Sequence, residues 1–189
     1  MRDFLCNLAS FTEEELDAIL SEGHRKTATA KELVFQAGNT FNKIWFIESG
    51  MMRAFRIIDG KDYTFFFFTK QNFAVDYHSF LTKTPSPLFF EVIADIEYME
   101  FSRDTIFSLY DIHPRFERVG RIMAEQAFVS ATERFRQLQG ESLEVRYQKL
   151  LAQDPELFQT IPQHHIASYL SVRPQSLSRI RAKLSGKKY

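Results

Sequence analysis

The segment 161–189 carries the side chains best suited to bind a polyanion. It holds six basic residues and no Asp or Glu, whereas residues 1–160 hold 18 basic and 24 acidic residues. Positive charge concentrated in one part of a chain attracts nucleic acid phosphates. A solvated basic terminus is the simpler alternative, so charge alone does not decide. The six basic residues are Arg173, Arg179, Arg181, Lys183, Lys187 and Lys188.

Two short helical patterns meet at a break inside this segment. Their ranges are about 162–170 and 174–184, and the second begins with a proline, which suits the first turn of a helix. Thr160 with Gln163 predicts a capping box before the first helix. Ala167 is a small residue where the helices must cross. The apolar residues at helical spacing are Ile166, Leu170, Val172, Leu177, Ile180 and Leu184. The pattern predicts a helix-turn-helix.

Other chemistry finds little support in the sequence. Cys6 is the one cysteine, which excludes an internal disulfide, a four-cysteine iron–sulfur cluster and a zinc ribbon. His164 and His165 are adjacent and lack the i, i+4 spacing of a helical metal pair. No Gly-rich phosphate loop, nucleophile elbow or paired-carboxylate motif is present. We therefore expect no enzyme, no catalytic residue and no metal site.

Upstream of the basic segment, short strands follow one helix. Residues 10–22 form an amphipathic helical pattern that Ser10 or Thr12 can cap. The region 33–101 then has β-prone runs separated by turn residues, of which Asp59-Gly60 is the strongest hairpin signal. The predicted strands are 33–35, 44–47, 51–58, 63–68, 88–94 and 97–101. Strands at this spacing predict a barrel or a sandwich.

The aromatic run 65–68 lies in one of these strands. Successive side chains on a strand point to opposite faces, so we expect both faces to be covered by the core or by an interface. A ligand-binding role is the less favoured reading.

A long helix follows the strands. A short helical piece near 103–110 precedes a helix over about 114–139, which at ~1.5 Å per residue spans roughly 39 Å. Its apolar stripe is broader than one small domain needs, which predicts a dimerisation helix; packing on the barrel is the alternative. The residues predicted to form this stripe are Phe116, Val119, Met123 and Ala127. A further helix over 142–152 ends at Asp154-Pro155.

The sequence also bears on localisation. No apolar run approaches the length of a membrane span, and the N-terminal residues, with Asp3 and the acidic run 13–15, do not form a signal peptide. We expect a cytoplasmic protein without a membrane partner.

This order of parts resembles the CRP/FNR (catabolite activator) family of bacterial transcription regulators, most specifically in the stretch IASYLSVRPQSLSRIRAKL. The resemblance implies an α+β fold with a jelly-roll barrel, or double-stranded β-helix, of the cyclic-nucleotide-binding type. It implies a sensor barrel over 1–112, a dimerisation helix over 113–140 and a helix-turn-helix over 141–189. Double-stranded DNA, a second copy of the chain, RNA polymerase and a small effector are the implied partners.

By this resemblance the recognition helix is 174–184. Gln175, Ser178 and Arg179 occupy the positions that reach base edges, where Gln suits adenine and Arg suits guanine. The residues expected to contact phosphates are Arg173, Ser176, Arg181 and Lys183. Two departures stand out: Ser171 replaces the usual glycine of the turn, at a cost of about 1 kcal/mol, and with the last residue at Tyr189 we expect no β-hairpin wing.

The effector site implied by the resemblance falls on 72–94. Val75 stands where the family has Gly, Asp76 replaces a Glu, and 85–87 replaces the Arg-Ser/Thr pair. No Arg occurs between Arg56 and Arg103, and a Lys binds phosphate without the guanidinium fork. The usual contacts to cAMP are therefore missing. The candidate pocket residues are Phe73, Val75, Asp76, Tyr77, Lys83 and Ser86.

Three readings of the sensor remain open: another small ligand, an empty site, or an interior filled by aromatic residues such as Phe73, Tyr77 and Phe80. We predict a CRP/FNR-type regulator with an unknown effector. The alternatives are a sensor or scaffold protein that no longer reads DNA, and a cyclic-nucleotide-responsive activator with substituted contacts.

Overall fold

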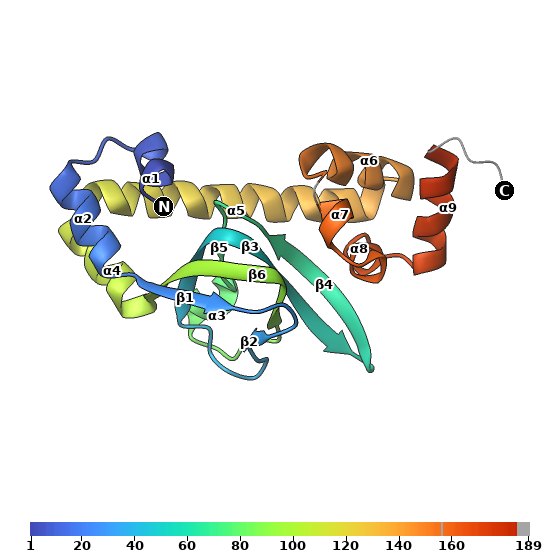
Figure 1. The fold of residues 1–189 in the computed structure, drawn as a ribbon, viewed down its shortest axis with the longest axis horizontal. Helices are drawn as coiled ribbons and strands as arrows, with labels where there is room; N and C mark the ends of the chain where they lie inside the picture. The colour runs from blue at the N-terminus through green and yellow to red at the C-terminus, as the bar shows by residue number, and fades with distance from the viewer. Residues whose placement is uncertain (156, 185–189) are drawn as a thin grey trace. The chain divides into compact units, whose positions relative to one another are not determined.

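The computed structural model describes residues 1–155 and 157–184 (Figure 1). Lys187 and Lys188 of the basic segment lie outside the described residues. The chain divides into two compact units. The sensor unit comprises 1–54 and 67–128. The C-terminal unit comprises 55–66 together with the chain from 129 onward, so it includes the tip of a β-hairpin from the middle of the sequence.

The sensor unit combines a sheet with helices. Its helices are α1 (Arg2–Leu8), α2 (Glu13–Ser21), α3 (Tyr77–Thr82), α4 (Arg103–Ile112) and the first half of α5 (Pro114–Gly140). The strands of the sheet are β1 (His24–Ala28), β2 (Leu33–Phe35), β3 (Lys43–Ile58), β4 (Lys61–Phe68), β5 (Phe73–Ala74) and β6 (Phe89–Ser102), and residues 55–66 of β3 and β4 belong to the C-terminal unit. The sheet order is β1-β6-β3-β4, with β2 paired to β6 and β5 paired to β3. The α+β prediction is confirmed.

Two strands are longer than predicted. β3 runs through the Glu48-Ser49-Gly50 segment, and β6 runs through Ala94 to Glu97, so neither expected break is present. Gly50 has φ +81°, and a Cβ there would lie 2.1 Å from the Asp95 carbonyl oxygen. Gly50 therefore lets β3 approach β6 closely without a turn.

The β3–β4 hairpin turns where the sequence predicted it. Asp59 and Gly60 have φ +49° and +73°. Two positive φ values in a two-residue connection fit the twist of antiparallel strands, which is why Asp-Gly is favoured there. The aromatic run in β4 is only partly covered: Phe65 is 38% exposed, and Phe68 packs inside the sheet. The core thus covers Phe68 but not Phe65, and cover of Phe65 by an interface with a second copy stays a prediction.

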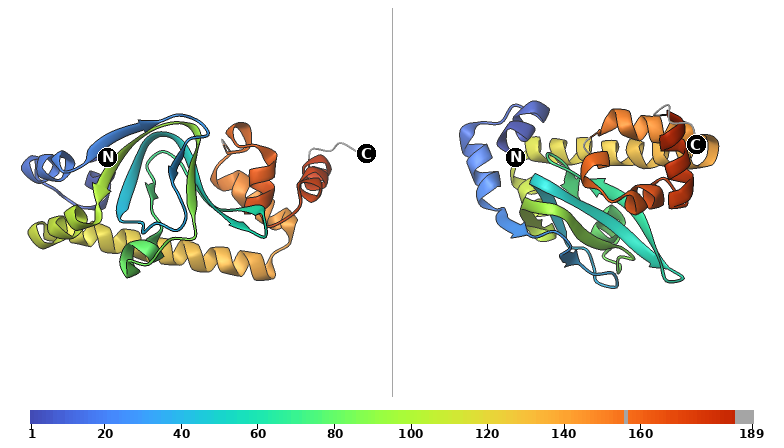
Figure 2. Two further views of the ribbon diagram at one scale, coloured as in Figure 1. Left: turned by 90° about the horizontal axis from the view of Figure 1, so that it is seen from below. Right: turned by 45° about the vertical axis from the view of Figure 1, so that its right-hand side comes forward.

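The strands of the sensor unit curl around an interior (Figure 2). Aromatic rings fill this interior. Phe41, Trp45 and Phe90 are at most 2% exposed, and their ring centroids lie 4.8–5.5 Å apart. Phe35 and Phe68 pack against Phe90 at 5.9 Å. The interior is therefore a packed core, although Phe73 and Phe80, two of the residues expected to fill it, belong elsewhere.

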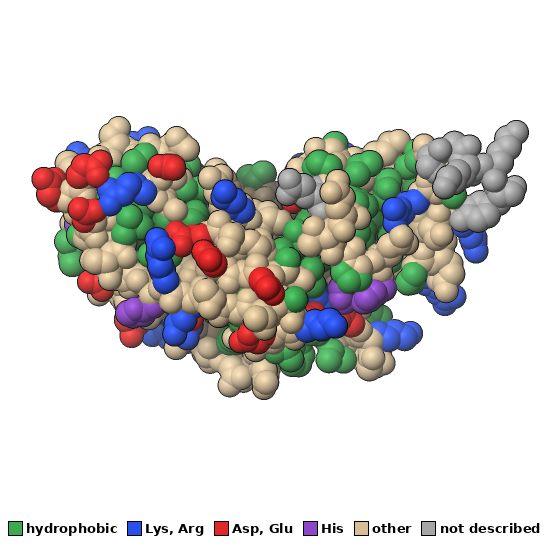
Figure 3. Space-filling model, viewed as in Figure 1, with side chains coloured by type: hydrophobic (Ala, Val, Ile, Leu, Met, Phe, Trp, Pro, Cys, Tyr) green, Lys and Arg blue, Asp and Glu red, His purple; other side chains and the backbone are tan. Residues whose placement is uncertain are grey.

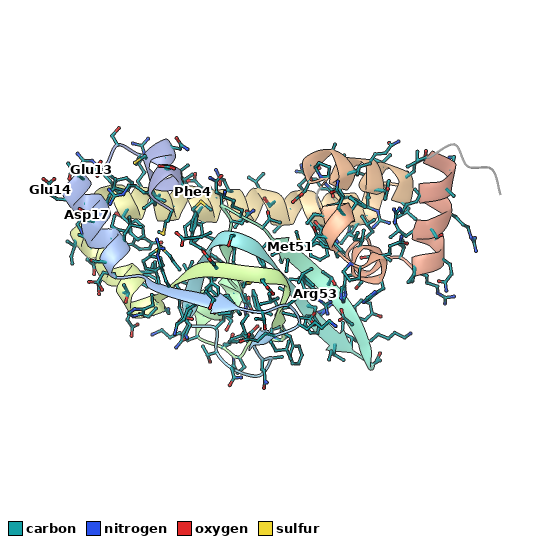
Figure 4. All side chains as sticks on the ribbon, in the orientation of Figure 1. Phe4, Glu13, Glu14, Asp17, Met51 and Arg53 are labelled. Atoms are coloured by element: carbon teal, nitrogen blue, oxygen red, sulfur yellow. The ribbon has the colours of Figure 1, made fainter. Side chains whose placement is uncertain are left out.

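A second core lies between the sheet and the helices. Phe4 of α1 points toward the sheet (Figure 4), with its ring 5.4 Å from Phe46 and 5.5 Å from Phe73. Phe80 of α3 also belongs to this core. Acidic and basic side chains intermingle over α1 and α2 (Figure 3), where Arg2 pairs with Glu13 at 2.6 Å.

Helix ends follow the capping signals in most places. Thr12 and Glu15 form a capping box at α2, and Ser142 caps α6 (Leu143–Gln153). The helices α7 (Leu157–Thr160), α8 (Gln163–Tyr169) and α9 (Pro174–Leu184) follow in the C-terminal unit. The predicted capping box at α8 is wrong, because Thr160 ends α7 and Pro162 precedes α8 without a side-chain cap. None of the described helices combines the length and apolarity needed to cross a membrane.

Candidate nucleic-acid interface and sensor pocket

The C-terminal unit contains the predicted pair of crossing helices. α8 and α9 pack through Ile166, Ala167, Leu170 and Leu177, none of which is more than 1% exposed. Ala167 is fully buried, as a small residue at a close helix crossing must be. The bounds of α9, Pro174–Leu184, are those that the sequence predicted.

The turn between these helices is a Schellman motif. The Ser171 N–H donates to the Ser168 carbonyl and the Val172 N–H to the Ala167 carbonyl, both at 2.9 Å. Ser171 has φ +56°, the left-handed conformation usually supplied by glycine. The chain thus keeps the geometry of the turn with a residue that has a Cβ.

Ser171→Gly should raise the free energy of unfolding by roughly 0.5–1 kcal/mol. Glycine removes the Cβ strain of a left-handed residue, and the extra entropy of the unfolded glycine offsets part of that gain. Thermal denaturation measures the change. Ser171→Ala is the matched control, because it removes the hydroxyl but keeps the Cβ. An equal gain in both variants would show that the hydroxyl, and not the backbone, is responsible.

Two arginines secure the end of α8. The Arg146 Nη1 donates to the Leu170 carbonyl at 2.7 Å, and the Arg134 guanidinium donates to the Tyr169 carbonyl and lies 3.8 Å above the Tyr169 ring. Burial lowers the pKa of Arg134. Positive charge at a helix C-terminus is favourable, and these bonds satisfy carbonyls that α8 itself leaves free. The sequence pattern did not reveal this role, because both arginines lie in other helices.

The predicted base-reading residues share one face of α9. Gln175, Ser178 and Arg179 are exposed and follow three- and four-residue steps, opposite the buried Leu177. Arg173, before the first turn, is also exposed. α9 has no acidic residue in its first turn. This face can therefore approach an anionic surface along its whole length.

The other residues predicted to contact phosphates are partly buried or already paired with another side chain. Ser176 and Arg181 are half-buried, and Lys183 is exposed but pairs with Glu144 of α6 at 2.7 Å. An exposed ion pair contributes little to stability, so Lys183 can exchange this partner for a phosphate at small cost.

Asp76, the carboxylate of the predicted effector site, already accepts hydrogen bonds from other residues of the chain. Asp76 is 8% exposed; one of its oxygens accepts from the Ser86 hydroxyl at 2.6 Å and the other from the Ser79 N–H at 3.3 Å. Ser86 is 1% exposed, and its oxygen also accepts from the Leu88 N–H at 3.0 Å. Lys83 is exposed at the C-terminal end of α3, with φ +59°. Asp76 and Ser86 therefore form a closed network.

The remaining predicted pocket residues border a small apolar cavity. Phe73, Val75 and Tyr77 line a space of about 40 Å³ together with Tyr110 and residues of α4 and α5. Burial raises the pKa of Tyr110 to about 12 and also raises that of Tyr77. Both phenols are thus neutral at physiological pH. Ligand pockets for drug-sized molecules measure roughly 300–1,000 Å³, so the cavity is far too small for a nucleotide.

The predicted dimer stripe on α5 needs correction. Phe116 and Val119 are 4% and 2% exposed and belong to the core of the sensor unit, so neither is available to a partner helix. Met123 packs against the same core, and Ala127 is exposed. The alternative, packing on the chain's own sheet domain, holds for this part of the stripe.

Other α5 residues carry the exposed apolar surface. Phe128, Val129 and Phe135 are 71%, 63% and 61% exposed. The positions Ala124, Phe128, Ala131, Phe135 and Leu138 follow alternating steps of four and three residues. That spacing is the heptad pattern of helices that pair side by side.

Several solved structures share this architecture. FixK2 from Bradyrhizobium japonicum superposes with a TM-score of 0.74 at 17% identity, over 87% of this chain and 85% of that one. The c-di-GMP-responsive global regulator CLP from Xanthomonas campestris gives 0.71 at 15% identity, over 93% and 92%. A transcriptional regulator of the crp/fnr family from Eubacterium rectale gives 0.70 at 12% identity, over 96% and 87%.

The chain has the fold of the CRP/FNR regulators. At these identities the similarity rests on the order and fold of the elements and not on shared residues. No family model matches the sequence, and no curated protein does. The features that this chain shares with the CRP/FNR fold are the order of its elements and the helix-turn-helix formed by α8 and α9.

Proposed function

We propose that this chain is a dimeric, sequence-specific DNA-binding transcription regulator that reads its operator with α9. The observation that carries the proposal is the exposed face of Gln175, Ser178 and Arg179 on the second helix of a tightly packed helix-turn-helix. In such motifs the second helix enters the major groove while the first crosses the backbone. The regulators with the same fold support this assignment.

The side chains on α9 suit separate roles. Arg179 donates two hydrogen bonds to N7 and O6 of a guanine, and Gln175 pairs with N6 and N7 of an adenine. Ser178, three residues beyond Gln175, lies beside it on the same face, and its hydroxyl can donate to or accept from a base edge. Arg173, Ser176, Arg181 and Lys183 bind phosphates and fix the register of α9 in the groove.

Dimerisation doubles this interface. The exposed heptad positions of α5 pair with the same positions of a second copy, which places two copies of α9 against two half-sites. Half-sites one helical turn apart require recognition helices about 34 Å apart. An effector that alters the α5 pairing changes this distance and hence the operator affinity.

The effector is not a cyclic nucleotide held by the usual contacts. Such a phosphate needs a guanidinium and free N–H groups, whereas no Arg lies between Arg56 and Arg103. Asp76 bonds to Ser86 and Ser79 instead of remaining open to a ribose. A small uncharged ligand at the apolar cavity, or a protein partner, is consistent with these contacts.

Selection from a random duplex library tests the proposal. We expect wild-type protein to enrich a palindrome with half-sites one turn apart. Arg179→Ala should lower affinity by about 1–3 kcal/mol per half-site and relax the preference at one base pair. Arg118→Ala, which removes an exposed arginine from the sensor-unit half of α5, is the control and should enrich the same palindrome.

The opposite result would be retention that depends on salt but not on sequence. The chain would then be a sensor or scaffold protein that does not read DNA. Selection repeated with Arg179→Lys separates the effect of positive charge from that of bidentate hydrogen bonding to guanine. Lysine keeps the charge and loses the bidentate geometry.

A further inference from the structure

The tip of the β3–β4 hairpin is fastened to the first helix of the helix-turn-helix. The Thr64 N–H donates to the Ser168 Oγ at 2.8 Å, and the Ser168 Oγ donates to the Asp62 carbonyl at 3.0 Å. Thr64 is 4% exposed. The hairpin tip and the helices belong to the same compact unit. One serine side chain thus holds the hairpin backbone in register against α8.

This docking forms a groove with positive side chains on both walls. The groove measures about 620 Å³; Lys61 lines it from the hairpin, His164 from α8, and Arg173 from the start of α9. All three are exposed. Histidine side chains lie over α8 with basic side chains next to them (Figure 3). Asp62 is the one acidic residue among the lining residues, so the fixed charges of the groove sum to a net positive value.

The groove lies where a helix-turn-helix meets the DNA backbone. When the second helix lies in the major groove, its N-terminal residues reach base edges and the first helix crosses the DNA backbone. Arg173, the predicted phosphate contact at the start of α9, lines the groove together with Lys61. A phosphate bound by Arg173 therefore shares the groove with a second cation, which the hairpin supplies.

We propose that the β3–β4 hairpin is part of the DNA interface and that Lys61 contacts the phosphate next to the one held by Arg173. The inference rests on the proposed DNA-binding function and extends it to a strand pair outside the helix-turn-helix. The partner is duplex DNA, recognised through its backbone and not through its sequence. Lys61 thus adds affinity, while the base preference stays with α9.

Lys61→Gln tests the contact in the full-length protein on the selected operator. The slope of log K against log salt should become less steep by about 0.9 for each lost phosphate contact, and by about 1.8 for two protomers. Affinity at 0.1 M salt should fall about tenfold or more, with the enriched sequence unchanged. Lys61→Arg should keep wild-type affinity. Lys70→Gln, an exposed lysine in the sensor unit, is the control for total charge.

Ser168→Ala separates the effect of hairpin position from the effect of the Lys61 charge. Without the serine, the hairpin loses both hydrogen bonds to α8, so Lys61→Gln should cost much less in that background than in the wild type. This non-additivity indicates that Ser168 acts through Lys61. Circular dichroism confirms that each variant is folded.

Two results would overturn the inference. Lys61→Gln with wild-type affinity and salt slope would remove the hairpin from the interface. Tighter binding in Lys61→Gln or Ser168→Ala would show that the docked hairpin obstructs DNA instead of contacting it. Failure of the wild-type protein to bind any duplex is a different result, since it contradicts the proposed function itself.

Discussion

Phe135→Asp on α5 should convert the protein from a dimer to a monomer. Phe135 is 61% exposed and lies on the four–three pattern with Phe128, which is 71% exposed. In a two-fold dimer each position meets the same surface of the partner, so one substitution places two carboxylates in an apolar seam. Unpaired charges in such a setting cost several kcal/mol. The dimer dissociation constant should rise at least about a hundredfold.

Analytical ultracentrifugation measures this change, and operator binding provides a second readout. Two linked recognition helices bind far more tightly than one, because the second contact forms at high effective concentration. The monomer should therefore lose most operator affinity while its fold, followed by circular dichroism, is retained. A dimer of normal stability in Phe135→Asp would place the subunit contact elsewhere.

Gln126→Asp is the matched control for this substitution. Gln126 is exposed on the same helix but lies off the four–three pattern, so the added charge should leave the dimer intact. Phe135→Leu keeps an apolar side chain at the seam and should also dimerise. A loss of dimer in Gln126→Asp would attribute the effect to net charge.

The α5 surface shows how far the sequence determines packing. Its apolar residues cover more than one face, and periodicity alone could not assign Phe116 and Val119 to the chain's own core and Phe128 and Phe135 to solvent. The assignment depends on where the sheet and α4 lie against the helix, which is tertiary information. The sequence indicated that the helix is long and broadly apolar, and this is confirmed.

The helix-turn-helix was predictable because its signals are local. Proline at the start of α9, the apolar spacing and the small Ala167 all lie within one short segment, and the left-handed Ser171 follows from the turn that they require. The strand β1 was missed for the opposite reason. Its sequence, HRKTA, is polar and mostly exposed, and it becomes a strand only through pairing with β6.

The sensor site was predictable only in part, less than the helix-turn-helix and more than strand β1. The absence of an arginine was visible in the sequence, and so was the aromatic richness of the strands. Which aromatic rings fill the interior was not visible, because Phe73 and Phe80 differ from Phe41 and Phe90 in the core that they join in the folded chain and not in residue type. The bond between Ser86 and Asp76 joins residues on either side of α3 and also needs the folded chain.

Phe90→Ala should be the most destabilising single substitution in the sensor unit. Phe90 is fully buried, and its ring lies within 6 Å of the rings of Phe41, Trp45, Phe35 and Phe68. Removing a buried phenyl ring costs about 3–5 kcal/mol through lost burial and the cavity that remains. This is a large part of the roughly 5–15 kcal/mol that stabilises a typical domain.

Urea denaturation measures the loss, with Phe107→Ala as the control. Phe107 is also aromatic but is 36% exposed on α4, so its truncation should cost well under half as much. A cost below about 1 kcal/mol for Phe90→Ala would mean that the interior is loosely packed and has room for a ligand.

A small apolar molecule provides a second test of the same interior. An apolar cavity the size of a phenyl ring stays dry and binds benzene-like ligands. Benzene or indole should therefore raise the melting temperature of Phe90→Ala and leave the wild type unchanged, because the wild-type rings already fill that space. Stabilisation of the wild type by the same molecules would reveal an internal ligand site. Without it, the aromatic interior is not the effector site, and the small cavity beside Tyr110 and the Lys61 groove become the next sites to test.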